Sequence, residues 1–339
     1  MIDLAAQGIE VGVVEYGARL AVLRVPDRDG VLGDVVLGLD DYSADAAFLG
    51  ATVGRFANRI ADGSFTLDGR RHTVPCNEDG VALHGGTDGF DRHRFAPDPV
   101  RTDDGARSVT LRRTSPAGEN GFPGTLDVAV TYTVRGAELS IDHTATTDEP
   151  TVVNLTNHAY FNLTGRGGTV EDHLVRIPAR HYLPVDARLI PTGEVAPVAG
   201  TPFDLRAPTR IGTHLREPHP QLVPARGYDH TFVLDDPSDD GLRPAAYVEE
   251  PRSGRTLTMF TDQPGLQFYS GNFLDGTFAV RSGWTARQGD AFCLEAQHFP
   301  NSPNEPRFPT TVLRPGERYR SRIVIRFGVV PDPPGGHRA

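Results

Sequence analysis

The most evident absence in this 339-residue sequence is lysine, because all 34 basic residues are arginine. Without lysine the chain cannot form a Schiff base, and it cannot carry a phosphate-binding loop that ends in Gly-Lys. The formal net charge is −10, whereas proteins that bind nucleic acid present a basic surface to the phosphates. The sequence therefore excludes lysine-based catalysis, and we expect no nucleic-acid partner.

Cysteine is also scarce. Cys76 and Cys293 are the two cysteines, and neither has a companion at the spacing of metal ligands, so we expect free thiols. The histidines are scattered and show no ligand pattern such as H-x-x-x-H. We therefore expect no metal site.

Long hydrophobic runs are missing as well. No apolar stretch approaches the ~20 residues that cross a bilayer. The first residues, MIDLAAQGIEVGVVEYGARL, lack the basic region and apolar region of an export signal. We expect a cytoplasmic protein with no membrane partner.

Glycine and proline, in contrast, are abundant, with 37 and 28 copies spread along the chain. They separate short apolar runs, which is typical of many strands joined by turns. Residues 64–74 predict one hairpin, with Asp68-Gly69 at its turn. We predict an all-β protein with few short helices: one antiparallel β-sandwich domain over residues 1–328, then a disordered Pro/Gly-rich tail over 329–339.

The stretch 152–165 (VVNLTNHAYFNLTG) alternates as a strand does, with apolar residues on one side. The other side carries His158, Tyr160 and amides such as Asn154 and Asn162. These groups can hydrogen-bond a polyhydroxylated ligand and move a proton. The alternative is an ordinary exposed sheet face with polar content.

Two acidic residues stand out further along. Glu295 lies between Leu294 and Ala296 in an apolar strand, where burial would raise its pKa toward that of a useful general base. Asp229 could accept hydrogen bonds from two adjacent sugar hydroxyls, although Asp is also a common turn residue. Gln267 sits in a strand-like segment and could contact a ligand.

Two further candidates lie in the first hundred residues. His84 is followed by two glycines that would let the backbone approach a ligand closely, in a loop over residues 77–95 that is long enough to be functional. Asn58 and Arg59 would point to opposite sides of a regular strand, so joint action requires a bend. The simpler alternatives are a histidine in a flexible loop and a surface salt bridge.

Taken together, these segments resemble the aldose 1-epimerase (galactose mutarotase) family over residues 4–328. The motifs that carry the resemblance occur in the order GRFANRI (54–60), LHGG (83–86), NHAYFNL (157–163), YDHT (228–231), GLQ (265–267), GNF (271–273) and LEAQ (294–297).

The resemblance implies a mutarotase-type β-sandwich with the sugar in an open cleft on a concave sheet, and no metal or organic cofactor. It implies Glu295 as the general base, His158 as the general acid and His84 as an assisting histidine. It also implies four substrate-binding residues: Asn58, Arg59, Asp229 and Gln267. The implied substrates are free aldohexoses such as galactose and glucose, and we expect a monomer or a homodimer.

These residue types suit the implied reaction. Exchange of α and β anomers needs a proton removed from the C1 hydroxyl and one delivered to the ring oxygen, followed by rotation about C1–C2 and ring closure. A carboxylate and an imidazolium can do both and exchange roles on closure. This predicts that Glu295 is ionised and His158 protonated at rest.

Three other functions fit the same sequence. A glycoside hydrolase would use Asp229 and Glu295 as its carboxylate pair. A hexose-phosphate 1-epimerase would need extra arginines near the cleft, such as Arg55, Arg92 or Arg94. A non-catalytic module would bind sugar through the same polar face.

Overall fold

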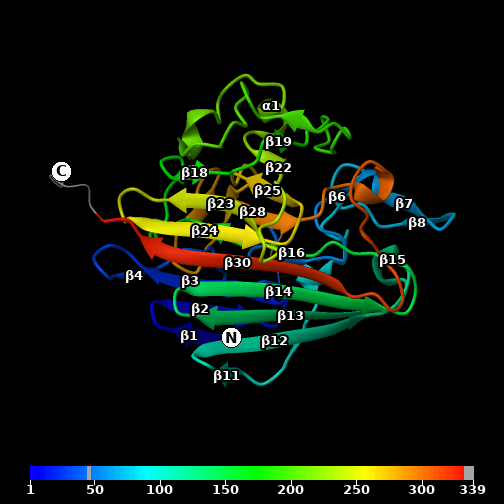
Figure 1. The fold of residues 1–339 in the computed structure, drawn as a ribbon, viewed down its shortest axis with the longest axis horizontal. Coiled ribbons are helices and arrows are strands. Elements are labelled where there is room, and N and C mark those ends of the chain that lie inside the picture. The colour runs from blue at the N-terminus through cyan, green and yellow to red at the C-terminus, as the bar shows by residue number, and fades with distance from the viewer. Residues whose placement is uncertain (44–46, 332–339) are drawn as a thin grey trace.

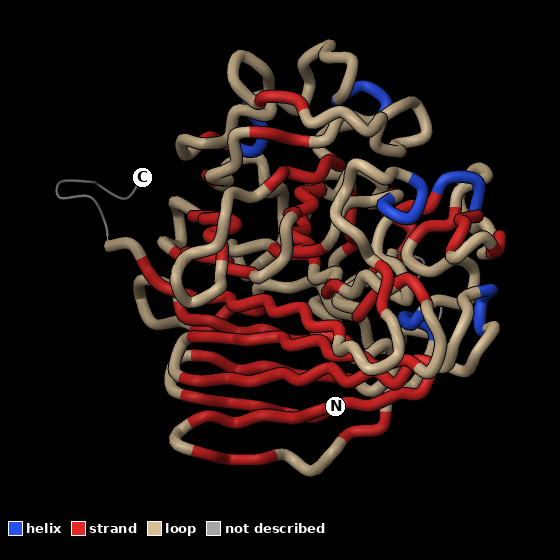
Figure 2. Tube along the Cα trace, turned by 45° about the vertical axis from the view of Figure 1, so that its right-hand side comes forward, coloured by secondary structure: helices blue, strands red, loops and turns tan. Residues whose placement is uncertain are grey.

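The structure is a computed structural model that describes residues 1–43 and 47–331. Nearly all of its regular elements are strands, which confirms the predicted all-β class. Figure 2 shows strands in red through the body of the molecule and helix in blue only as short turns within loops. The helical segments are α1 (Leu222–Ala225) and the 3-10 turns Ala61–Gly63, Phe90–Arg92, Glu119–Gly121, Ile211–Thr213 and Ser302–Asn304.

The largest sheet is ten-stranded and antiparallel, and its long strands lie side by side in Figure 1. Its spatial order is β10 (Ala96–Pro97), β12 (Ala106–Ser115), β13 (Leu126–Arg135), β14 (Glu138–Thr147), β30 (Tyr319–Val329), β24 (Arg255–Thr261), β23 (Arg243–Glu249), β18 (Leu174–Arg176) and β21 (Thr209–Arg210), with β11 (Arg101–Asp103) paired to β12.

A six-stranded antiparallel sheet forms the second layer. Its order is β17 (Tyr160–Phe161), β28 (Phe292–Gln297), β25 (Gly265–Tyr269), β22 (Asp229–Val233), β19 (His181–Tyr182) and β20 (Ala196–Pro197). Val130 and Ile323 of the large sheet share one buried apolar cluster with Phe268 and Leu294 of this sheet. Side chains alternate along a strand, so the residues between these apolar positions point to the opposite face of the six-stranded sheet.

Smaller sheets complete the chain. They are β1 (Ile2–Ala6), β2 (Ile9–Val14), β3 (Arg19–Pro26) and β4 (Leu32–Asp34) in one sheet, and the pairs β5 (Thr52–Val53) with β16 (Thr156–Asn157), β6 (Arg59–Ile60) with β9 (Ala82–Leu83), β7 (Ser64–Leu67) with β8 (Arg70–Thr73), β15 (Thr151–Val152) with β29 (Val312–Leu313), and β26 (Asp275–Ala279) with β27 (Thr285–Arg287). The β7–β8 pair is the predicted hairpin, and both turn residues, Asp68 and Gly69, have positive φ.

The segment 152–165 is not the single strand that its alternation predicts. Three two-residue strands, β15, β16 and β17, overlap this segment, and they pair with β29, β5 and β28 respectively. Because each piece has a different partner, no continuous ladder forms. The alternation still separates the sides: Leu155, Ala159 and Phe161 lie in the core.

The buried apolar core draws on the described part of the chain almost from end to end. The largest buried apolar cluster includes residues from Leu4 near the first residues to Phe327 in β30. Val329 is the last residue of β30, and residues 332–339 of the expected tail lie outside the described part. Among the described residues, no helix combines the length and the apolar character needed to cross a bilayer.

Candidate active site

The register of the six-stranded sheet brings several polar side chains to its outer face. Glu295 on β28 is paired with Gln267 on β25. Two positions along the same strands, and so on the same face, Cys293 is paired with Tyr269, and Tyr269 is paired with Asp229 on β22. The alternation that places Leu294 in the core therefore directs Glu295 and its neighbours away from it.

Three loops close over this face, and each places a residue in the left-handed region: Phe48, Asn58 and His84 have φ of 60°, 65° and 52°. Left-handed backbone is uncommon for residues other than glycine, and its concentration at one place is typical of functional sites. The bend at Asn58 is the one that its joint action with Arg59 requires.

The glycines after His84 lie against other parts of the protein. A Cβ on Gly85 would lie 2.0 Å from the carbonyl oxygen of Gly54, and one on Gly86 would lie 2.6 Å from that of Pro75. Both glycines therefore permit a close approach between two parts of the protein. These glycines allow the loop to pack tightly enough to hold His84 in place.

Together, strands and loops enclose a cavity of about 200 Å³. It is lined by Ala47, Phe48, Asn58, Arg59, Glu78, Leu83, His84, His158, Tyr160, Asp229, Tyr269, Phe273, Leu274 and Glu295. Six of the seven site residues predicted from the sequence are in this set. The seventh, Gln267, is buried behind the cavity wall: its amide donates to Asp229 Oδ1 (2.6 Å) and its oxygen accepts from Thr231 (2.5 Å).

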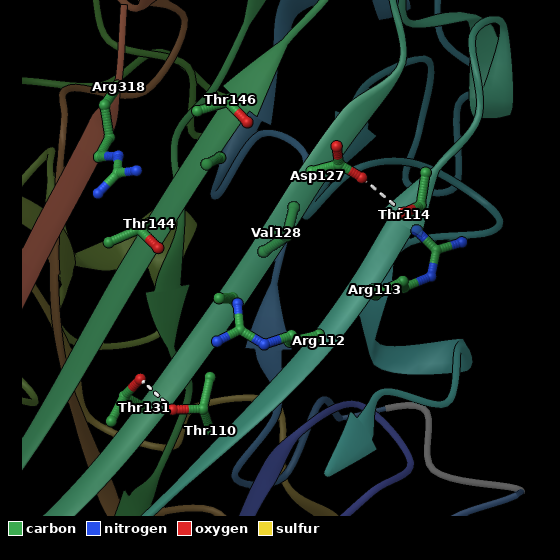
Figure 3. A pocket seen from close by; sticks show the side chains of 12 residues that line it. Thr110, Arg112, Arg113, Thr114, Asp127, Val128, Thr131, Thr144, Thr146 and Arg318 are labelled. Atoms are coloured by element: carbon green, nitrogen blue, oxygen red, sulfur yellow. Dashed lines mark hydrogen bonds between the residues drawn. The ribbon is translucent and has the colours of Figure 1, made fainter. Parts of the chain in front are cut away.

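A larger hollow of about 600 Å³ lies over the outer face of β12, β13 and β14. Figure 3 shows it lined by threonines and arginines, with Asp127 bonded to Thr114 and Thr110 bonded to Thr131. It contains one carboxyl group and no histidine, so it holds no pair of groups for acid–base chemistry. The smaller cavity is therefore the candidate active site.

Glu295 and His158 are the central pair of that cavity. Glu295 Oε1 lies 3.7 Å from His158 Nε2, and both side chains are buried. Burial raises the pKa of Glu295 well above its ordinary value, with a further contribution from Asp229. Burial lowers the pKa of His158 to about 4. Both shifts work against the state that the reaction needs, in which Glu295 is ionised and His158 is protonated.

The backbone fixes the imidazole of His158 at this position. His158 N–H donates to Ala51 (2.8 Å), and its carbonyl accepts from Gly50 N–H (2.9 Å). The rings of His84 and His158 meet edge to face with centroids 5.0 Å apart. His84 Nδ1 accepts a hydrogen bond from Asn58 N–H at 3.1 Å. Burial, with the nearby charges of His158 and Arg59, lowers the pKa of His84 well below its ordinary value.

Arg59 forms the charged corner of the cavity. It binds Glu78 through two nitrogens, at 2.8 and 3.1 Å, and Asp229 through a third at 3.4 Å. Burial works against its charge, but the two carboxylates outweigh burial and raise the pKa of Arg59. Burial in turn raises the pKa of Asp229, and Arg59 opposes that rise.

Sequence reasoning missed Glu78 and did not single out Tyr269. Glu78 lies six residues before His84 in the loop that we identified as functional, and a buried arginine needs such a partner. Tyr269 shares a strand face with Gln267, so the same alternation points it outward. Tyr160 stacks on His158 with ring centroids 5.0 Å apart and also lines the cavity.

Among the described residues, His84, His158 and Glu295 form a group whose potential ligand atoms lie within 4.8 Å of one another. Two imidazoles and a carboxylate are a common donor set for zinc. The scattered sequence positions of the histidines gave no sign of this cluster, since it exists only through the fold. His84 Nδ1 already accepts a hydrogen bond from the Asn58 backbone N–H, so Nε2 is the one nitrogen of that ring left to act as a ligand atom.

Comparison with known proteins identifies the family. The sequence pattern of the family described as aldose 1-epimerase matches residues 1–326. Galactose mutarotase from Rattus norvegicus is 44% identical over 331 residues, covering 96% of this chain and 93% of the relative. Aldose 1-epimerase from Escherichia coli is 39% identical, covering 94% and 92% respectively.

Solved structures show the same fold. An aldose epimerase homologue from C. elegans superimposes with a TM-score of 0.88 at 32% identity, covering 97% of this chain and 99% of that one. Galactose 1-epimerase from Lactobacillus acidophilus gives 0.83 at 31% identity, covering 95% and 92%. The fold and site thus define an isomerase of the mutarotase type. This chain belongs to the aldose 1-epimerase family, which confirms the resemblance read from its motifs.

Proposed function

We propose that this protein interconverts the α and β anomers of free aldohexoses, galactose and glucose among them, with Glu295 and His158 as its acid–base pair. The observation that carries this proposal is the 3.7 Å approach of the two buried groups inside one small cavity. Both reacting oxygens of the sugar, the C1 hydroxyl and the ring oxygen, are bonded to C1. The two groups that serve them must therefore be neighbours.

The reactive form of the pair has Glu295 ionised and His158 protonated. From this form Glu295 takes the proton of the C1 hydroxyl while His158 delivers one to the ring oxygen, and the ring opens to the aldehyde. After rotation about C1–C2, the groups reverse their roles as the ring closes on the other face. His84 assists by donating toward the ring oxygen. Glu295 gains a proton when His158 loses one, and the reverse happens on closure. The pair therefore holds one proton in total before and after each turnover.

The remaining wall of the cavity is suited to holding the sugar. Asp229 and Arg59 provide a carboxylate and a guanidinium, which hydrogen-bond adjacent hydroxyls with complementary polarity. Asn58 adds an amide. Gln267 acts from behind by orienting Asp229, through the 2.6 Å hydrogen bond. Phe48 and Tyr269 supply apolar surface on which a sugar ring can rest.

Two alternatives have less support. Asp229 is held by Arg59 and Gln267, so it is not a free partner to Glu295 for glycoside hydrolysis. For a phosphosugar, Arg55, Arg92 and Arg94 were the possible anchors, but none of them lines the cavity. Arg55 instead donates to the carbonyls of Pro123 and Gly124.

We further propose that the protein works in the cytoplasm as a monomer or homodimer, without a nucleic-acid or membrane partner. Every residue to which this mechanism gives a role belongs to one chain, so the mechanism does not require a second copy. Activity per chain should then be independent of protein concentration in a dilution series followed by light scattering.

Polarimetry tests the proposal. Freshly dissolved α-galactose, α-glucose and a pentose are followed with and without the protein, with Asp127→Asn as a control because Asp127 lies in the outer hollow. We expect faster approach to anomeric equilibrium with both hexoses, equal in the control. No acceleration with any sugar would contradict the proposal, and release of sugar from a chromogenic glycoside would favour the hydrolase.

A further inference from the structure

Glu78 lies at the rim of the cavity, where its side chain is 35% exposed while that of Arg59 is buried. It begins a two-residue turn, because its backbone bridges to Val81 and the two residues between them have positive φ. The pairing of β6 with β9 brings this turn beside Arg59. The two carboxylate oxygens of Glu78 accept from Arg59 Nε at 2.8 Å and Nη2 at 3.1 Å. The carboxylate is therefore held in place by a bidentate pair.

The charges of the cavity do not balance. Among the described residues that line it, the carboxyl groups belong to Glu78, Asp229 and Glu295, and the guanidinium to Arg59. Glu295 and His158 share one proton, so this pair has no net charge whichever group holds it. The second histidine of the lining is neutral, because burial lowers its pKa well below the ordinary value. Asp229 and Arg59 cancel each other, which leaves one negative charge that disappears if Glu78 is removed.

The field of Glu78 extends into the cavity. Burial raises the pKa of Asp229, and the charge of Glu78 adds to that rise. A cleft with low-dielectric walls focuses the field of the charges that line it. At a separation of about 8–10 Å and an effective dielectric constant of about 20, one unit charge changes the binding of another by about 15- to 30-fold. A charged sugar would therefore sense Glu78 without touching it.

Glu78 also occupies the cation that an acidic sugar would need. Each of the three nitrogens of Arg59 already donates to a carboxylate, two of them to Glu78 and the third to Asp229. A carboxylate or phosphate on the substrate would have to compete with these bonds. Repulsion by Glu78 and the loss of Arg59 as a partner act in the same direction.

We propose that Glu78 is a specificity-determining residue that makes the cavity reject aldoses with a negative charge, such as uronates and sugar phosphates, in favour of neutral and cationic aldoses. This inference rests on the proposed anomer exchange and narrows the substrate class of the same site. The charge acts through the field in the cavity and through Arg59, and takes no part in the proton transfers.

Three sugars of one ring configuration test the charge. Near pH 7 galactose is neutral, galacturonate is anionic and galactosamine is largely cationic. The kcat/KM of each is measured by polarimetry with the spontaneous rate subtracted, and galacturonate is also tested as a competitive inhibitor of galactose exchange. In Glu78→Gln, which keeps the size of the side chain, we expect the galacturonate-to-galactose ratio to rise by about 10- to 30-fold. The galactosamine-to-galactose ratio should fall.

Two further measurements locate the effect. Asp79→Asn is the matched control, because Asp79 is the exposed neighbour of Glu78 and does not line the cavity; both ratios should stay close to those of the wild type. Salt tests the wild type without any substitution. Raising the ionic strength from about 0.01 to about 1 M shortens the Debye length from about 30 to about 3 Å, so the galacturonate-to-galactose ratio should rise and the galactosamine ratio should fall.

Equal changes for all three sugars in Glu78→Gln would overturn the proposal, because Glu78 would then only support Arg59. A change in Asp79→Asn as large as that in Glu78→Gln would also overturn it. If Glu78→Gln does not fold, wild-type ratios that are independent of salt would refute the proposal. Failure of the proposed function is distinguishable, because the wild type would then not accelerate galactose exchange. The affinities of the three sugars, measured by calorimetry, would still show whether Glu78 selects against negative charge.

Discussion

The pH dependence of anomer exchange is the sharpest test of the acid–base pair. Below a pH of about 4, the lowered pKa of His158, both groups are protonated and no base is present. Above the raised pKa of Glu295, both have lost their protons and no acid is present. Between these limits the pair holds one proton, so we expect a flat kcat bounded by an acid limb from the histidine and an alkaline limb from the carboxyl group.

This assignment reverses the usual one, in which the carboxylate sets the acid limb. This reversed profile is possible because two forms of the pair contain one proton each: the reactive form, with Glu295 ionised and His158 protonated, and the form with the proton on Glu295. The change from 6.5 to about 4 for His158 corresponds to about 3 kcal/mol, since one pKa unit is worth 1.36 kcal/mol. The reactive form is thus disfavoured roughly 300-fold by burial of the histidine alone, and bound sugar must compensate.

The substitution Glu295→Gln shows which limb of the pH profile belongs to Glu295. The amide keeps the shape of the side chain but accepts no proton, so exchange should fall by about 10²- to 10⁴-fold, the usual worth of a positioned base. Residual activity, measured by polarimetry with the spontaneous rate subtracted, should have lost its alkaline limb. Persistence of that limb in Glu295→Gln, or near wild-type exchange, would refute this reasoning. Sugar binding should survive, which separates catalysis from a binding module.

Three further predictions concern the framework of the site. His143 is buried, and folding lowers its pKa from 6.5 to about 4. Its contribution to the free energy of unfolding should be fully present above pH 6.5 and fall by about 3 kcal/mol as the pH approaches 4. In urea unfolding, His143→Leu should remove this part of the pH dependence, and an unchanged pH slope would contradict the prediction. Gly85→Ala should displace His84 and lower both Tm and the rate of anomer exchange, because the new Cβ would lie 2.0 Å from the Gly54 carbonyl oxygen. Gly69→Ala is the control: Gly69 also has positive φ, but no atom lies within 4 Å of the added Cβ, so the rate of anomer exchange should not change. Arg59→Met should destabilise the fold by about 3–5 kcal/mol, because it leaves Asp229 buried without its cation. Adding Asp229→Asn should recover part of that loss. Additive losses in a double-mutant cycle would argue against an energetic coupling between Arg59 and Asp229.

Much of the site could be predicted because its chemistry is local in the sequence. The isolated Glu295 in an apolar strand indicates a functional carboxylate without any tertiary information. His158 and Tyr160 share one side of an alternating segment, and they do line the cavity together. The Asp68-Gly69 turn likewise predicts its hairpin, because only a few residues adopt positive φ easily.

Other features were not predictable from the sequence because they depend on partners distant in the chain. Residues 152–165 look like one strand, but three different partners divide them. Gly85 was expected to approach a ligand, whereas it packs against Gly54, some thirty positions earlier. The sequence also gave no sign that Gln267 hydrogen-bonds Asp229. Nothing in the spacing of the histidines predicts that two of them meet Glu295 within 4.8 Å.

The sequence by itself determined the residue types, the all-β class and the family, because alternation, turn residues and ordered motifs are properties of neighbours along the chain. Only the tertiary structure decided the electrostatics. Burial depends on what every other segment covers, and here it lowers the pKa of His158 and raises that of Glu295. The contact of Cys293 with His158, across 135 positions of the chain, likewise arises from sheet pairing that no local pattern encodes.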